Sequence, residues 1–331
     1  MKISKNRLLS LLKVLFGLLV LSFLFLWVDL FKVWQILKET DIKIVIFLFL
    51  IFISDRLFMA FKWGLLLRAN NSKIPFSNLA KAYFYAAFAG QFLPASIGGD
   101  IVRYYKVKNR SITNSQLFTS VALEKFFGMI AIFVVSILAF VYSAKYIHGI
   151  YNFNILFLIV GVILILLLIV LSLSIKTVVF EKVLAPYDNK LIKMFKKFLT
   201  SLKSYSKRIN ILLLFFVLCL IEQAFPIFSD YLYAHSLNIS ISLIAMAFIV
   251  STTNFLSRIP ISLSAIGIQE GILTGLFLLL GFSKEQGLAL GLGTRVLEIL
   301  FTLPIPIIYF SDLMKSVKFA KKESFMENEK S

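Results

Sequence analysis

Runs of about 20 apolar residues recur along the whole chain, and a helix of that length crosses the ~30 Å hydrocarbon core of a membrane. The composition agrees, because 59% of the residues are hydrophobic and only 16% are charged. Soluble domains average about 25% charged residues. We therefore predict an all-α integral membrane protein.

About six of these runs are long enough and regular enough to be full transmembrane helices. We expect them at 8–28, 42–67, 116–142, 155–175, 211–235 and 286–310. Two other apolar stretches, 79–102 and 241–282, contain helix breakers, among them Pro94 and Pro260. Proline removes a helical hydrogen bond, and broken backbone at membrane depth occurs only where protein or water surrounds it. We predict that both stretches are broken-helix pairs.

Basic residues flank the stretch 79–102 on both sides, with Lys73 and Lys81 near its start and Arg103 and Lys106 at its end. Lys and Arg favour the cytoplasmic side of a membrane, so this stretch should enter and leave from that side as a re-entrant pair. The second stretch then enters from the outer side, and both termini lie in the cytoplasm.

The two broken stretches share a pattern. Pro94 precedes Gly98, Gly99 and Asp100, while Pro260 precedes Gly267 and Glu270. Each stretch is followed by a span with a glutamate, Glu124 in the first case and Glu298 in the second. We interpret the two halves as inverted repeats, an arrangement that puts a substrate site near the middle of the membrane.

We expect one polytopic membrane domain at 1–314 and a disordered cytoplasmic tail at 315–331. A basic cytoplasmic loop at 176–210 should carry an amphipathic helix that lies on the anionic inner leaflet, or an ordinary solvated helix. The net charge of +18 follows from such cytoplasmic segments, so we expect membrane lipids as partners and no nucleic acid. Cys219 is the only cysteine, and the two histidines form no ligand cluster, so we expect no metal and no cofactor.

The segments LPASIGGDIVR at 93–103 and SRIPISLSAIGIQEG at 257–271, together with the span pattern, resemble a known family. This is the lysylphosphatidylglycerol synthase transmembrane region, the flippase-like membrane domain of the multiple peptide resistance factor and of many stand-alone proteins. The resemblance covers nearly the whole chain. It implies that the family motif falls on Pro94, Gly98, Gly99, Asp100, Arg103, Pro260, Gly267 and Glu270. The chain has Glu124-Lys125 where family members often have Glu-Arg, and lysine lacks the bidentate fork of arginine.

Charged residues inside a membrane usually face a pathway or a partner. If a new helix begins after Gly99, Asp100 can cap it, and the free N–H groups of that half-helix can bind a phosphate together with Arg103 and Arg258. Glutamates can then attract a cationic headgroup such as an aminoacyl amine. Arg295 and Glu298 can pair along their own helix. The candidate acids for a cationic group are Glu124, Glu270 and Glu298. Asp55-Arg56 and Glu124-Lys125 are sequence neighbours, and helical neighbours do not face each other, so each of these residues should need a partner on another helix or water.

The favoured function is translocation of a phospholipid or lipid-linked headgroup, aminoacylated ones included, across the cytoplasmic membrane. The alternatives are the membrane part of a phosphatidylglycerol lysyltransferase-type system, working with a separately encoded lipid-modifying enzyme, and an ion-coupled transporter of a small solute. No catalytic residue stands out, and the soluble transferase domain of the full-length family enzymes does not follow. We therefore expect no synthase activity from this chain on its own.

Overall fold

The computed structural model describes residues 22–23, 25–70, 72–92, 97–108, 112–143, 209–258 and 265–307. Within these ranges the chain forms helices and no strand. The helices are α2 (Leu30–Leu37), α3 (Ile42–Ala69), α4 (Phe76–Phe92), α5 (Ile97–Val107), α6 (Asn114–Ser143), α10 (Ile209–Glu222), α11 (Ala224–Ser236), α12 (Leu243–Leu256), α13 (Ile268–Leu279) and α14 (Lys284–Thr302). The all-α prediction is confirmed for this part of the chain.

Four helical segments are long and apolar enough to cross a membrane, namely Ile42–Ala69, Asn114–Tyr142, Asn210–Ser236 and Lys284–Ile307. They correspond to four of the predicted spans. The predicted span at 155–175, most of that at 8–28, the loop at 176–210 and the tail at 315–331 lie outside the described residues. The short helix α2, which precedes the first of the four segments, was not predicted.

The third of these segments is not one straight helix, as the sequence analysis assumed, because α10 ends at Glu222 and α11 begins at Ala224. Pro226 explains the interruption. It has no N–H to donate to the carbonyl of Glu222, and its ring crowds the preceding turn. At the break, the Gln223 N–H instead donates to the Leu220 carbonyl at 3.2 Å.

Polar residues before the helices fix where several of them begin. Asp41 accepts a hydrogen bond from the Lys43 N–H at 2.9 Å at the start of α3. Ser242 accepts one from Ala245 at the start of α12, and Ser283 accepts one from Gln286 at the start of α14. Such caps satisfy N–H groups that have no partner within the helix.

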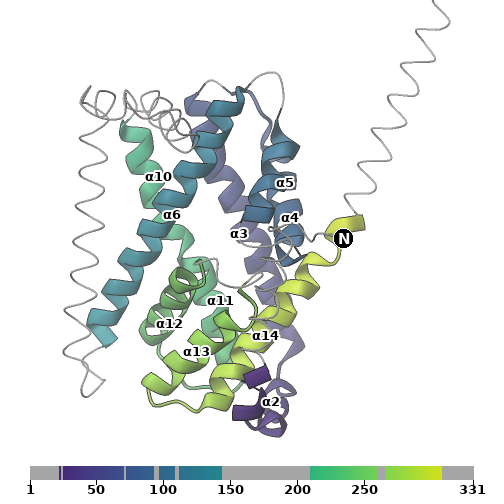
Figure 1. Cartoon of the computed structure of the whole chain (residues 1–331), viewed down its shortest axis with the longest axis vertical. Coiled ribbons are helices and arrows are strands. Elements are labelled where there is room, and N and C mark those ends of the chain that lie inside the picture. Colours follow the sequence, from purple (N-terminus) through teal and green to yellow (C-terminus); the bar gives the residue numbers. More distant parts are fainter. Residues whose placement is uncertain are drawn as a thin grey trace, which may run out of the picture.

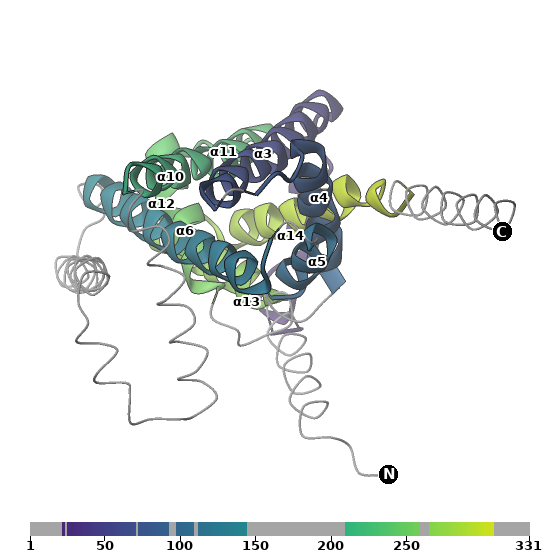
Figure 2. The same cartoon turned by 90° about the horizontal axis from the view of Figure 1, so that it is seen from above.

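The two predicted broken stretches each form a pair of short helices, and the residues at both breaks, 93–96 and 259–264, lie outside the described residues. In Figure 1, α4 and α5 lie side by side in the upper half of the molecule, whereas α12 and α13 lie in the lower half. Seen from above, α14 runs between α3 and α4 on one side and α6 and α13 on the other (Figure 2).

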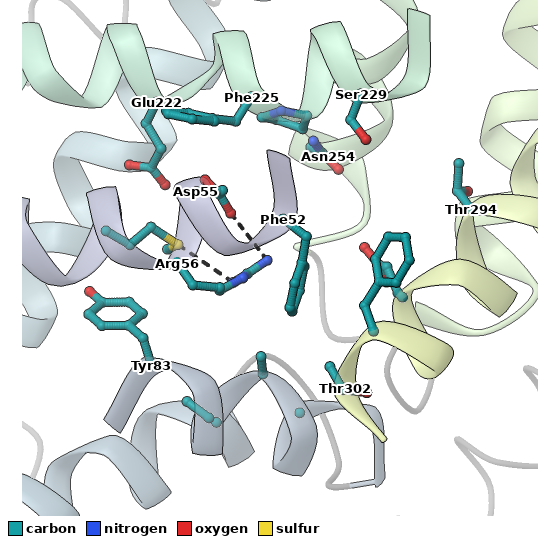
Figure 3. Close-up of a pocket in the computed structure, with 18 of the residues that line it drawn as sticks. Phe52, Asp55, Arg56, Tyr83, Glu222, Phe225, Ser229, Asn254, Thr294 and Thr302 are labelled. Carbon is teal, nitrogen blue, oxygen red and sulfur yellow. Dashed lines mark hydrogen bonds and ion pairs between the residues drawn. The ribbon is translucent and has the colours of Figure 1, made fainter. Parts of the chain in front are cut away.

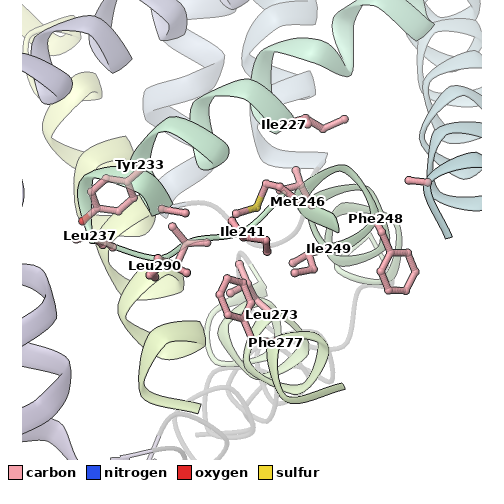
Figure 4. Packing of buried hydrophobic residues seen from close by; sticks show 14 of the residues in the cluster. Ile227, Tyr233, Leu237, Ile241, Met246, Phe248, Ile249, Leu273, Phe277 and Leu290 are labelled. Atoms are coloured by element: carbon pink, nitrogen blue, oxygen red, sulfur yellow. The ribbon is translucent and has the colours of Figure 1, made fainter. Parts of the chain in front are cut away.

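Apolar side chains pack into two main clusters, one at each pair. Trp63, Leu67, Leu79 and Leu117 belong to the cluster around α3, α4 and the start of α6. The other cluster joins α6, α11, α12, α13 and α14 (Figure 4). Its labelled members include Met246, Phe248, Phe277 and Leu290.

Candidate functional site

A cavity of about 530 Å³ lies inside the bundle and is lined by residues from α3, α4, α5, α6, α10, α11, α12, α13 and α14. Its lining includes six acidic and six basic residues. The acids are Asp55, Asp100, Glu124, Glu222, Asp230 and Glu298, and the bases are Arg56, Lys62, Arg103, Lys125, Arg258 and Arg295. Charges are costly in a membrane unless they pair or face water, so this concentration marks the cavity as the polar centre of the molecule.

Arg103, on α5, is the most enclosed of the basic residues that line the cavity near the first helix pair. Only 2% of it is exposed, and its Nη1 donates to Glu124 Oε2 at 2.6 Å and to the Tyr83 hydroxyl. Its Nη2 donates to Asp100 Oδ1 at 3.1 Å. The guanidinium also lies 4.5 Å from the ring centres of Trp63 and Tyr83. Arg103 is therefore occupied by protein groups on several sides.

The same network ties α6 to its neighbours. The Tyr83 hydroxyl donates to Glu124, and Lys125 forms an ion pair with Asp100 Oδ2 at 2.7 Å. Trp63 Nε1 donates to the Ser120 hydroxyl at 3.0 Å. Glu124 and Lys125 thus find partners on other helices, as expected. The N-cap role suggested for Asp100 is wrong, because α5 begins three residues earlier, at Ile97.

On the other side of the cavity, α3 contributes a buried lysine. Lys62 is 1% exposed and pairs with Glu222, the last residue of α10 before the helix break. About two turns earlier, Asp55 and Arg56 pair with each other at 3.3 Å, and Arg56 lies over the Phe52 ring (Figure 3). Asp55 and Arg56 thus contact each other although they are neighbours on one helix, and both line the cavity, whereas the sequence predicted a partner on another helix or water.

The second helix pair is joined to α14 by a further ion pair. Arg295 Nε donates to Glu270 Oε1 at 2.9 Å, and its Nη2 donates to Gln269 at 3.0 Å. Glu270 also accepts from the Gly267 N–H at 2.8 Å, where Gly267 adopts a φ of +78° that favours glycine. Arg295 therefore pairs with another helix, whereas the sequence suggested that it pairs with Glu298.

Three charged residues of the cavity stand apart from these pairs. In the part of the chain that the structure describes, the side chains of Arg258, Asp230 and Glu298 make no hydrogen bond and no ion pair. Arg258 lies at the end of α12, Asp230 on α11 and Glu298 on α14. Ser229, Asn254 and Thr294 add neutral polar groups to the lining (Figure 3).

The structure brings most of the predicted site residues to this cavity. Those that line it are Gly99, Asp100, Arg103, Glu124, Arg258, Arg295 and Glu298. Gly98 is buried in the first turn of α5, and Gly267 and Glu270 lie at the start of α13, next to Arg295. Pro94 and Pro260 lie outside the described residues. Among the described residues, no group of three or more His, Cys, Asp or Glu is arranged to hold a metal ion.

Sequence reasoning missed Trp63, Tyr83 and Lys62 as members of the site. Tyr83 and Trp63 sit in apolar helices rich in aromatic residues, where nothing in the sequence distinguishes them from core side chains. Lys62 did carry a signal, because it is a charge inside the predicted span 42–67, and such charges usually face a cavity or a partner.

An all-helical bundle with several helices long enough to cross a membrane, built around a charged cavity, is a multi-pass membrane protein. The chain belongs to the family described as the lysylphosphatidylglycerol synthase TM region, which it matches over residues 10–305. It is also similar to the UPF0104 membrane protein PH1989 of Pyrococcus horikoshii, with 23% identity over 197 residues. This match covers 59% of the chain and 57% of that relative, which is less than two thirds of its length.

Proposed function

We propose that the protein is a flippase-like lipid transporter that moves a polar headgroup through the charged cavity while the acyl chains stay in the membrane. The observation that carries this proposal is the cavity with its balanced set of acids and bases inside an otherwise apolar bundle. Transfer of a charged headgroup from water to hydrocarbon is strongly unfavourable in free energy. Polar and charged side chains that line the cavity can replace the water that the headgroup loses.

We infer the charge of the headgroup from the three lining residues that make no hydrogen bond or ion pair among the described residues. The guanidinium of Arg258 suits a phosphate, because its N–H groups can donate two parallel hydrogen bonds to phosphate oxygens. Asp230 and Glu298 suit a cationic group such as the amine of an aminoacylated lipid. A headgroup with both a phosphate and an amine satisfies all three residues at once. Gly99, Glu124 and Arg295 would line the path beside it.

The arrangement of the helices supports this proposal. The first helix pair is followed by α6, which carries Glu124, and the second is followed by α14, which carries Glu298. Because the two pairs lie in opposite halves of the bundle, they suit the inverted repeats proposed from the sequence (Figure 1). Inverted halves with broken helices at their interface are typical of transporters whose site lies at the middle of the membrane.

The topology that we propose has re-entrant pairs, both termini in the cytoplasm and the protein in the cytoplasmic membrane. Lys73, before α4, and Lys108, after α5, are both exposed. Single cysteines that replace them, in a Cys219→Ala background, should both react with an impermeant thiol reagent from the cytoplasmic side. Reaction of the two from opposite sides would show that the α4–α5 pair crosses the membrane and that the halves are not inverted.

Transport itself is tested with purified protein in liposomes that contain headgroup-labelled lipids. We expect the label to become accessible from the other leaflet faster than in protein-free liposomes, and faster for phosphate lipids with an amine than for neutral glycolipids. Uptake of a water-soluble amino acid or organic anion, without lipid movement, would instead support the small-solute transporter. Formation of a modified lipid from added donors would support a role in lipid synthesis, alone or with a separately encoded enzyme.

A further inference from the structure

The wall of the cavity between α5 and α6 is closed by charged groups. On α5, Gly99, Asp100 and Arg103 line the cavity, and on α6, Glu124 and Lys125 do so. Arg103 pairs with Glu124 at 2.6 Å, and Asp100 pairs with Lys125 at 2.7 Å. These two ion pairs, together with the hydrogen bond from Tyr83 to Glu124, are called the latch below.

The α4–α5 pair is a tightly packed unit. A Cβ on Gly99 would lie 2.8 Å from the Ala86 carbonyl oxygen, so the backbones of α4 and α5 are in close contact there. At its other end, α5 is anchored by Val107, which belongs to the apolar cluster that also holds Ile112 and Leu117 at the start of α6. The pair is therefore held to α6 by apolar contacts at the C-terminal end of α5 and by the latch near its N-terminal end.

The two ends differ in how readily they separate. Separation of α5 from α6 at the apolar contacts removes side-chain packing and leaves a void. A polar headgroup cannot replace that packing. Parting the latch leaves Arg103 with Asp100 and Tyr83, which belong to the same helix pair. On α6 it leaves Glu124 and Lys125, one charge of each sign, which a headgroup with a phosphate and an amine can bind.

Even when the latch is closed, Arg103 is not fully satisfied, because its buried Nε has no hydrogen-bond partner among the described residues. A buried donor without an acceptor destabilises the closed state, and opening the latch lets water or lipid reach it. The outer surfaces suit lipid, since Ile101 on α5 and Phe118 and Met129 on α6 are exposed apolar side chains.

From these observations we infer that the seam between the α4–α5 pair and α6 is the lateral portal through which the lipid headgroup reaches the cavity. The latch closes this portal in the present structure, and the portal opens when the N-terminal end of α5 moves away from α6. The inference rests on the proposed function only in naming a lipid as the molecule that passes; the opening of the seam is a property of the protein that can be measured without transport.

The opening is tested by the reactivity of a cavity thiol. Ser229 lines the cavity on α11, away from the seam, and Ser229→Cys in a Cys219→Ala background provides a single thiol of nearly the same size. Adding Glu124→Gln removes the carboxylate that pairs with Arg103 and keeps an acceptor for the Tyr83 hydroxyl. We expect a charged methanethiosulfonate to modify the cavity thiol about tenfold faster in this variant, which corresponds to the 1.4 kcal/mol of one charge-assisted contact.

Glu222→Gln is the matched control, because it removes the same charge from an ion pair that joins α3 and α10 rather than the seam. It should change the rate of modification less than about twofold. Lys125→Gln is a second latch variant, needed in case the Glu124 variant does not fold. The Lys125 side chain is 38% exposed, so its loss breaks the ion pair with Asp100 without leaving a buried charge. It should accelerate modification by a smaller factor. Equal rates in the latch variants and the control would overturn the portal.

A cross-link provides the second arm. Asp100→Cys and Lys125→Cys, joined by a short bifunctional thiol reagent in the Cys219→Ala background, should stop lipid movement, and reduction of a cleavable linker should restore it. Undiminished lipid movement in the linked protein would refute the portal. If the unlinked protein moves no lipid, the proposed function fails, while the thiol reactivity still decides whether the seam opens.

Discussion

The two broken-helix pairs each bring an arginine to the same cavity, and the two arginines are in opposite situations. Arg103, from the first pair, is 2% exposed and bound to Glu124, Asp100 and Tyr83. Arg258, from the second pair, lines the cavity without a hydrogen bond or ion pair to the described residues. These two arginines, one after the first break and one before the second, are therefore suited to different roles, the first to holding the structure and the second to binding a headgroup.

This contrast changes the interpretation of the sequence motif. The half-helix argument placed a phosphate beside Arg103 and Arg258. In the closed arrangement, however, the protein's own carboxylates occupy the positions that a phosphate would take. Of the two arginines predicted to bind a phosphate, Arg258 is the one whose guanidinium makes no hydrogen bond or ion pair among the described residues.

The largest effect should follow removal of the bound arginine. Arg103→Met leaves Glu124 buried without its partner, and breaking a buried pair from one side costs about 3–5 kcal/mol. We expect a strongly reduced melting temperature in detergent and a low yield of folded protein. Arg258→Met should leave the melting temperature near that of the unaltered protein, because it loses no ion partner among the described residues. A similar loss of melting temperature in the two variants would contradict the different roles assigned to Arg103 and Arg258.

The next effect is a change in lipid translocation when Arg258 is replaced. Arg258→Lys keeps the charge but lacks the planar fork, so lipid translocation should slow about tenfold, the equivalent of 1.4 kcal/mol of lost phosphate contact. The melting temperature should be unchanged, which separates this loss from misfolding. Near-normal movement of a phosphate lipid by the lysine variant would return Arg258 to a structural role.

A third effect, on stability, is expected at one of two glycines of the first pair. Gly99→Ala places a Cβ 2.8 Å from the Ala86 carbonyl oxygen, so the helices must separate, at a cost of about 1–3 kcal/mol. Gly90→Ala, on α4, meets no atom within 4 Å and serves as the control. Thermal unfolding should show destabilisation by the first change only. If Gly99→Ala were as stable as Gly90→Ala but inactive, Gly99 would serve the headgroup rather than the contact between helices.

Much of the fold could be predicted from the sequence, because long apolar runs and helix breakers act locally. The runs at 42–67 and 116–142 became α3 and α6, and the stretches around Pro94 and Pro260 became helix pairs rather than single spans. The break at Gln223 was missed, although Pro226 lies inside the predicted span 211–235. A proline within an apolar run is often tolerated in membrane helices, so it gave no clear signal.

The composition of the site was harder to predict than its location. Intramembrane charges identified much of the charged lining, but their pairing depends on which helices meet. Arg295 lies three residues from Glu298 in sequence, yet its partner is Glu270, 25 residues away. Trp63 and Tyr83 joined the site because α3 and α4 pack beside α5, and nothing local distinguishes them from other aromatic residues in apolar helices.

The central claim is that lipid headgroups pass through the charged cavity, and blocking the cavity tests it most directly. Ser229→Cys in a Cys219→Ala background is reconstituted in liposomes, and lipid translocation is measured before and after modification with a bulky cationic thiol reagent. The account predicts that modification reduces translocation to the rate of protein-free liposomes, while Cys219→Ala alone is unaffected by the reagent. Translocation that continues at the original rate through a fully modified cavity would contradict the account.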